Sequence, residues 1–114
     1  MPDSGHPNSI ASLELAFLRA LCASEDIRAL FEEISPALRS LKWQDPDHAI
    51  VYDTLSKVPA RDRRPLREQL PAIATRMGFP DMDWGNYFVA GAVEVPAREI
   101  LEIARKLAAA ASRR

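Results

Sequence analysis

The chain has 114 residues, 47% of them hydrophobic and 27% charged, and its 15 basic and 16 acidic side chains leave a formal net charge of −1. This length predicts one domain that closes a single core without disulfides or metal. The apolar fraction is typical of a globular protein and excludes wholesale disorder. The near-zero charge removes the electrostatic case for general nucleic-acid binding, which normally needs a clearly basic face.

The cysteine count and the distribution of apolar residues predict where the protein works. Cys22 is the only cysteine, so no internal disulfide can form, and a reducing compartment is indicated. The first residues carry neither a basic region nor an apolar run, and no segment has the roughly eighteen continuous apolar residues of a membrane span. We therefore expect a cytoplasmic protein without a membrane segment.

The stretch from residue 10 to residue 23 organises the predicted fold. Only Ser12, Glu14 and Arg19 interrupt its otherwise apolar positions. A helix that is apolar round most of its circumference has to be covered by several others. This stretch therefore predicts a central first helix.

Residues 1–8 precede that helix and are expected to form a disordered tail, because their prolines, glycine and polar side chains bury nothing. Ser9 is placed to cap the first helix through its hydroxyl. The predicted helical domain then spans residues 9–112.

Helix start signals recur through the middle of the chain. Ser24 is placed to cap a second helix, and Ser35 followed by Pro36 predicts the start of a short third one. Asp45 is likewise a capping residue followed by a proline, and it predicts a fourth helix from about residue 46 to residue 57.

The next region combines charge with proline. Residues 59–65 read as an exposed loop, and helical spacing then runs from Leu66 to Met77. Pro71 lies inside that pattern and predicts either a kink or a break, whereas Gly78 is a reasonable C-cap. Asp83 is placed to cap a further turn or two.

The last helix is predicted to start at Pro96, and its apolar positions recur at helical spacing. No segment shows the alternation of a strand. The fold class predicted is all-α: a compact orthogonal bundle of about six helices around the apolar first helix, ending in a helical hairpin.

One local cluster has ligand chemistry, namely Asp45, Asp47 and His48. A metal or acid–base site needs such groups to converge, but Asp47 and His48 are adjacent on a helix and point about 100° apart. Capping by Asp45 is the stronger interpretation. Cys22 lies on an apolar stripe, which favours packing over nucleophilic chemistry. The sequence thus predicts no enzyme activity, no catalytic residue, no metal and no cofactor.

Two further groups have a functional and a structural interpretation. An arginine group could bind phosphate or an acidic partner, although the near-zero net charge favours the interpretation as a solvated loop. An aromatic group after residue 83 could line a ligand-binding site, although a place in the core or in a subunit interface is the favoured interpretation. These residues are Arg61, Arg63, Arg64 and Arg67 in the first group and Trp84, Tyr87 and Phe88 in the second.

Three stretches together resemble the N-terminal domain of replicative hexameric helicases of the DnaB type. The opening at residues 7–10 and its leucine-rich helix are similar to the way that domain begins. The closing segment from Trp84 through Val95 and Pro96 into the last helix is similar to its terminal helical hairpin. The more specific stretch, residues 43–52, matches an aromatic, any residue, Asp-Pro, any residue, His, and then an apolar pair. Its matching residues are Trp43, Asp45, Pro46, His48, Val51 and Tyr52.

The chain also departs from that family. Ala49 stands where the family usually has arginine, and Ala11 and Ser12 stand where an acidic residue is expected. There is no Walker motif and no ATPase domain, so the chain is not by itself a helicase. The helicase-binding C-terminal domain of bacterial primase is similar in fold and begins with a comparable helix, so kinship to it stays open.

The resemblance implies a non-catalytic protein-interaction module linked to DNA replication. Its partner would be a second copy, through the terminal hairpin, or a helicase or primase. Carried over by position, the self-association surface comprises Val89, Val93, Ile100, Ile103 and Leu107. The alternatives are a nucleic-acid-binding accessory protein that uses the arginine loop 61–67, a small enzyme or metal protein around His48, and a helical domain of unrelated function.

Overall fold

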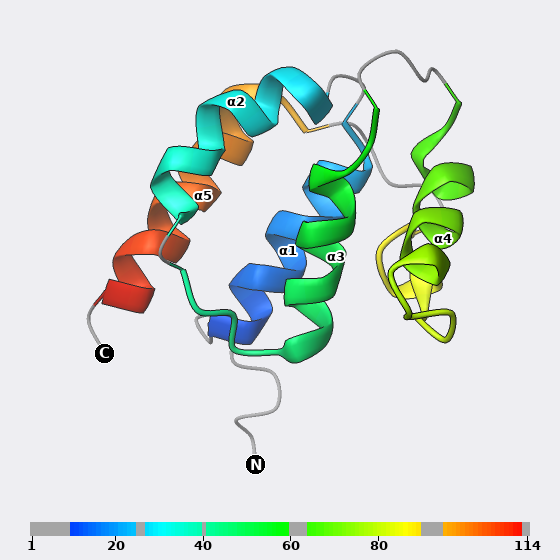
Figure 1. The fold of residues 1–114 in the computed structure, drawn as a ribbon. Coiled ribbons are helices and arrows are strands. Elements are labelled where there is room, and N and C mark those ends of the chain that lie inside the picture. Colours follow the sequence, from blue (N-terminus) through cyan, green and yellow to red (C-terminus); the bar gives the residue numbers. More distant parts are fainter. Residues whose placement is uncertain (1–9, 25–26, 40, 60–63, 90–94, 113–114) are drawn as a thin grey trace.

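The computed structural model describes residues 10–24, 27–39, 41–59, 64–89 and 95–112, and within these ranges it is helical without any strand (Figure 1). The predicted all-α class is therefore confirmed. The predicted tail and Ser9 lie outside the described residues. The elements are α1 (Ile10–Cys22), α2 (Ile27–Leu38), α3 (Pro46–Ser56), α4 (Leu66–Arg76), the 3-10 turn η2 (Trp84–Asn86) and α5 (Ala97–Ser112).

The helices pack in a connected row. α5 lies against both α1 and α2, α1 also packs on α3, and α3 in turn carries α4 at the edge of the molecule (Figure 1). The radius of gyration of 13.8 Å is close to the roughly 13 Å expected for a compact domain of this size. The core therefore forms where α1 meets α3 and α5.

α1 supplies the centre of that core, as its composition predicts. Phe17, Leu18 and Leu21 are completely buried. Burying three such side chains contributes roughly 5 to 9 kcal/mol, which is comparable to the whole net stability of a small domain. The fold therefore depends on this one helix more than on any local propensity.

The prediction that a new helix starts at Ser35 and Pro36 is wrong, because both residues lie inside α2. The helix continues through both residues to Leu38. The side chain of Ser35 hydrogen-bonds to Tyr52 rather than capping a helix, and Pro36 is exposed near the C-terminal end. Leu38 is buried on the same side as Ile34, so tertiary burial keeps the last turn helical.

α3 and α4 follow the predicted spans closely, but α4 continues through Pro71, so the alternative of a break there is wrong. The predicted role of Gly78 is confirmed by its φ of 100°. The Gly78 amide donates to Thr75 at 3.0 Å and the Phe79 amide donates to Ala74 at 2.8 Å. This pair of bonds is a Schellman motif, which ends α4.

The segment before the last helix is less helical than expected. Within the described residues 79–89, only the three residues of η2 are helical, and Asp83 precedes them without a side-chain capping bond. Residues 90–94 lie outside the described ranges, so η2 is the only described element in the expected first arm of the hairpin. α5 follows Pro96, as predicted. Within the described ranges, no helix has both the length and the apolar character to span a membrane.

Candidate functional site

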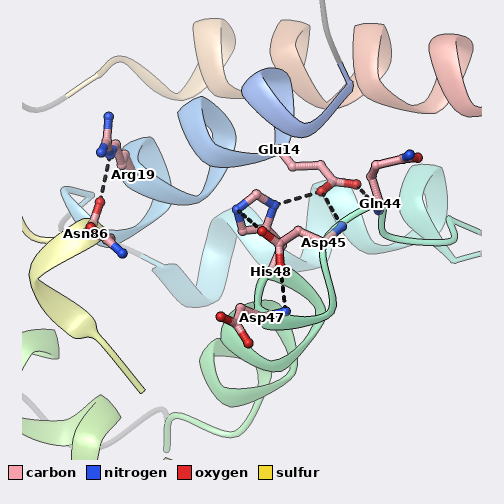
Figure 2. A network of polar contacts seen from close by, with 7 residues as sticks. All are labelled: Glu14, Arg19, Gln44, Asp45, Asp47, His48 and Asn86. Carbon is pink, nitrogen blue, oxygen red and sulfur yellow. Dashed lines mark hydrogen bonds and ion pairs between the residues drawn. The ribbon is translucent and has the colours of Figure 1, made fainter. Parts of the chain in front are cut away.

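Among the described residues, the most connected polar group is centred on Glu14, which α1 carries into the core. Its side chain is charged but has no exposed area, and its neighbours along the helix are apolar. The carboxylate accepts hydrogen bonds from the backbone amides of Gln44, at 2.5 Å, and Asp45, at 3.2 Å (Figure 2). Its Oε1 also lies 2.7 Å from Nδ1 of His48. Three donors therefore compensate the buried carboxylate.

His48 lies between two carboxylates. Nδ1 faces Glu14, and Nε2 lies 3.7 Å from Oδ2 of Asp45 (Figure 2). The other oxygen of Asp45 accepts the backbone amide of Asp47 at 2.9 Å, so Asp45 is the N-cap of α3. The capping interpretation of Asp45 is thus confirmed.

This arrangement, which we call the Glu14 clamp (Glu14, Gln44, Asp45 and His48), holds α1 against the N-terminal end of α3. The imidazole is only 5% exposed, and its edge packs against Tyr87, with ring centroids 6.2 Å apart. Both ring nitrogens face carboxylates of the chain itself. Within the described residues, no three His, Cys, Asp or Glu side chains are placed to hold a metal ion.

Sequence reasoning found Asp45 and His48 but missed Glu14. In the sequence, Glu14 is only an interruption of an apolar run. A signal was nevertheless present, because a carboxylate on a helix that is covered on most sides needs a buried donor. His48, at the start of an amphipathic helix, was a suitable candidate for that donor.

A second feature is a hollow of about 230 Å³, lined by residues 22–23, 65–67 and 87–89. It lies between the end of α1, the start of α4 and the segment after η2. Val89 is 43% exposed at this hollow, and the guanidinium of Arg67 lies 6.0 Å from the ring centroid of Phe88. The structure thus brings together Arg67 and Val89, which the sequence assigned to two different surfaces.

Two titratable groups at the hollow are shifted toward their neutral forms. Burial raises the pKa of the Cys22 thiol to about 12. Burial, together with the nearby carboxylates of Asp45 and Asp47, raises the pKa of Tyr87 to about 12. Both groups therefore stay protonated at neutral pH, and Cys22 is a packing residue there.

The five residues carried over as a self-association surface do not form one surface. Ile100 and Leu107 are completely buried, because they form the face of α5 that packs into the core. Their assignment to an exposed interface is therefore corrected. Ile103 is half-buried, Val89 is exposed, and Val93 lies outside the described residues.

The arginine group is also divided. Arg64 and Arg67 are exposed, but Arg67 belongs to the first turn of α4 rather than to a loop. Arg61 and Arg63 lie outside the described residues. Among the aromatic residues, Tyr87 is buried as core, whereas Trp84 and Phe88 are half-buried beside it.

A second hollow of about 420 Å³ lies between the C-terminal end of α2 and α3. Trp43 and Tyr52 form its aromatic wall, with ring centroids 5.1 Å apart. Arg39 and Asp53 bring opposite charges to its lining.

Comparison of the chain with protein-family models, with curated proteins and with solved structures finds no match. The likeness to the helicase N-terminal domain therefore depends on the three sequence stretches alone.

Proposed function

We propose that the chain is a non-catalytic protein-interaction module of the kind found at the N-terminus of DnaB-type replicative helicases. The observation that carries this proposal is the exposed valine and the half-buried phenylalanine at the rim of the hollow between α1, α4 and residues 87–89. There, exposed Val89 adjoins half-buried Phe88 under the guanidinium of Arg67. Aromatic residues and arginine at an exposed surface are typical of protein–protein contact sites.

The Glu14 clamp supports the same proposal. Its imidazole is buried and held between Glu14 and Asp45, so His48 offers no ring nitrogen to a substrate arriving from solvent. The Cys22 thiol, with a pKa raised to about 12 by burial, carries little thiolate at neutral pH. The Glu14 clamp therefore serves the fold, and in the proposed function the contact with another protein is made by the exposed surface around Val89.

The proposal extends to the finer architecture. Counted with η2, the described helical elements number six. In the proposed arrangement they form an orthogonal bundle, and the segment from η2 to α5 is its terminal hairpin. Val89 and Ile103 are the two members of the carried-over surface with area left for a partner. The partner is a second copy of the chain, a replicative helicase or a primase.

Size-exclusion chromatography with light scattering over a wide concentration range tests self-association. We expect a dimer at high concentration that dissociates in Val89→Asp and Ile103→Asp. Arg105→Asp, at an exposed position of the same helix as Ile103, is the matched control and keeps the dimer. Purified replicative helicase and primase are then titrated separately by calorimetry. A strict monomer that binds neither protein would overturn the proposal.

A further inference from the structure

The second hollow, between the end of α2 and one side of α3, has the size of a ligand site. Its volume of about 420 Å³ lies within the roughly 300 to 1,000 Å³ of known ligand pockets. Apolar atoms form the larger part of its wall, and Leu38, Leu41 and Ala49 supply aliphatic surface beside two aromatic rings. None of the described residues lines both hollows, so this site is separate from the surface around Val89.

The two aromatic rings, Trp43 and Tyr52, form a wall that is already fixed in the free protein. Both rings are half-buried, with centroids 5.1 Å apart. The indole stacks on buried Phe17, at a centroid distance of 6.4 Å, and the phenol packs on buried Phe31, at 4.9 Å. The Tyr52 hydroxyl is also hydrogen-bonded to Ser35. A wall held in this way loses little side-chain freedom when a ligand binds.

The charges of the lining do not favour a charged occupant. Arg39 and Asp53 are both exposed and have opposite signs. A ligand of either sign would therefore meet one attractive and one repulsive group at the same hollow. Charge complementarity selects an occupant that is uncharged and that covers the rings with apolar groups.

The polar groups of the same lining favour an occupant with acceptors. Trp43 carries an indole N–H and Arg39 a guanidinium, and both groups are donors only. Asp53 brings an acceptor, but its Oδ1 lies 3.7 Å from Nζ of Lys57, so that carboxylate is already shared. Carbonyl oxygens therefore complement this hollow better than N–H groups do.

From these complementarities we propose that the second hollow binds an uncharged proline-rich segment of a partner protein, with proline rings packed on Trp43 and Tyr52. Proline combines an apolar ring with a carbonyl acceptor and has no backbone N–H to leave unpaired. Aromatic-lined grooves bind such segments because their polyproline II conformation is preformed and costs little ordering entropy. The inference goes beyond the proposed function, because it assigns a second site to a different kind of partner segment.

The test is a titration of the ¹⁵N-labelled full chain followed by NMR, with a decaproline peptide with blocked ends as the probe. The indole N–H of Trp43 reports on the hollow, and that of Trp84, in η2, is the internal control. We expect saturable shifts of the Trp43 indole signal and of the amide signals of residues 38–39, 49 and 52–53. The Trp84 indole signal is expected to stay unchanged.

Control peptides of the same length separate the features of the ligand. Alternating glycine and serine is uncharged but offers no apolar ring, and we expect no saturable shift with it. Alternating leucine and serine is uncharged and apolar but has no preformed conformation, and it is expected to bind about tenfold more weakly than decaproline. Peptides with glutamate or lysine at every second proline are each expected to bind more weakly than decaproline.

Variants then locate the contact. Ala49→Gln fills the hollow without adding charge and is expected to weaken binding about tenfold or more. Ala72→Gln makes the same change at an exposed position of α4 and is expected to bind like the wild type. Trp43→Phe keeps an aromatic ring and removes the indole donor, so it is expected to weaken binding by a smaller factor than Ala49→Gln. Circular dichroism confirms that each variant keeps the fold.

Several outcomes would overturn the inference: equal binding of the leucine peptide, tighter binding of the glutamate or lysine peptide, unchanged binding by Ala49→Gln, or no shift of the Trp43 indole signal at millimolar decaproline. Broadening of the hollow's signals that disappears on dilution would also overturn it, because a second copy would then cover the site.

The proposed function fails separately from this inference. If decaproline binds and the wild type neither dimerises nor binds helicase or primase, the proline site stands and the helicase-like partnership falls. If the wild type dimerises through Val89 and Ile103 or binds helicase or primase, and decaproline does not bind, the interaction module stands and the proline site falls.

Discussion

Oε1 of Glu14 lies 2.7 Å from Nδ1 of His48, and the two buried side chains join the first helix to the third across 34 residues of sequence. The backbone amides of Gln44 and Asp45 complete the coordination of the same carboxylate. These contacts fix the N-terminal end of α3 against α1. The apolar face of α3 that follows, with Val51 and Leu55 fully or almost fully buried, is thereby aligned with the core.

The first prediction concerns the stability supplied by the Glu14 clamp. Glu14→Ala removes the acceptor and leaves His48 and two backbone amides buried without it. Because breaking a buried pair strands its partners, we expect the free energy of unfolding to fall by about 3 to 5 kcal/mol. Urea unfolding followed by circular dichroism measures the loss.

Two variants separate the clamp from a general effect of losing a glutamate. Glu14→Gln keeps an acceptor oxygen and is expected to recover part of the loss. Glu32→Ala, at an exposed position of α2, is expected to change stability by less than about 0.5 kcal/mol. A Glu14→Ala protein as stable as Glu32→Ala would show that the clamp contributes little to the fold.

Most of the fold could be predicted because the helix signals act locally. The apolar run at residues 10–23 predicts α1, and the Asp45 cap predicts α3. The error at Pro36 has a different cause. A proline that looks like a start signal is tolerated inside α2, because the burial of Leu38 outweighs one lost backbone hydrogen bond. Local signals cannot report burial against a distant helix.

The sites were harder to predict for the same reason. The Glu14 clamp joins residues on two helices, and no spacing in the sequence relates them. Ile100 and Leu107 look alike as core or interface residues, because both roles require apolar side chains at helical spacing. Only the packing of α5 against α1 and α2 decides that they belong to the core.

The second prediction concerns the reactivity of Cys22. Burial raises the pKa of this thiol from its ordinary value of 9.0 to about 12, which lowers the thiolate fraction at pH 8 about a thousandfold. We expect a disulfide reagent to label the folded protein slowly and to label it rapidly in concentrated guanidinium chloride. Fast, pH-independent labelling of the native state would contradict burial of this thiol.

The third prediction concerns alkaline unfolding. The pKa of Tyr87 is near its ordinary value of 10.0 in the unfolded chain, but burial and nearby carboxylates raise this pKa to about 12 in the folded protein. The folded state therefore keeps a proton that the unfolded state loses. The stabilising contribution is complete below pH 10 and is lost as the pH rises toward 12, by up to about 1.4 kcal/mol per pH unit.

Tyr87→Phe isolates that contribution, because it removes the titrating hydroxyl and keeps the ring. Cys22 titrates in the same range and contributes to the pH dependence of both proteins, so the difference between them is the quantity to measure. We expect urea unfolding between pH 9.5 and pH 11 to show a steeper loss in the wild type. Parallel curves would mean that the Tyr87 hydroxyl is solvated in the folded state.

The fourth prediction concerns the proline inside α2. Alanine at position 36 restores the backbone donor to the carbonyl of Glu32, and proline inside a helix is about 3 kcal/mol less favourable than alanine. The greater freedom of the unfolded chain offsets about 0.4 to 1 kcal/mol of this gain. Since Pro36 lies near the helix end, where the penalty is smaller, we expect Pro36→Ala to raise the free energy of unfolding by about 1 to 2 kcal/mol, measured by thermal melting.

Pro96→Ala, directly before α5, is the control and is expected to have little effect, because no helical donor is needed at that position. A Pro36→Ala protein that melts no higher than the wild type would indicate that α2 ends before Pro36 in solution.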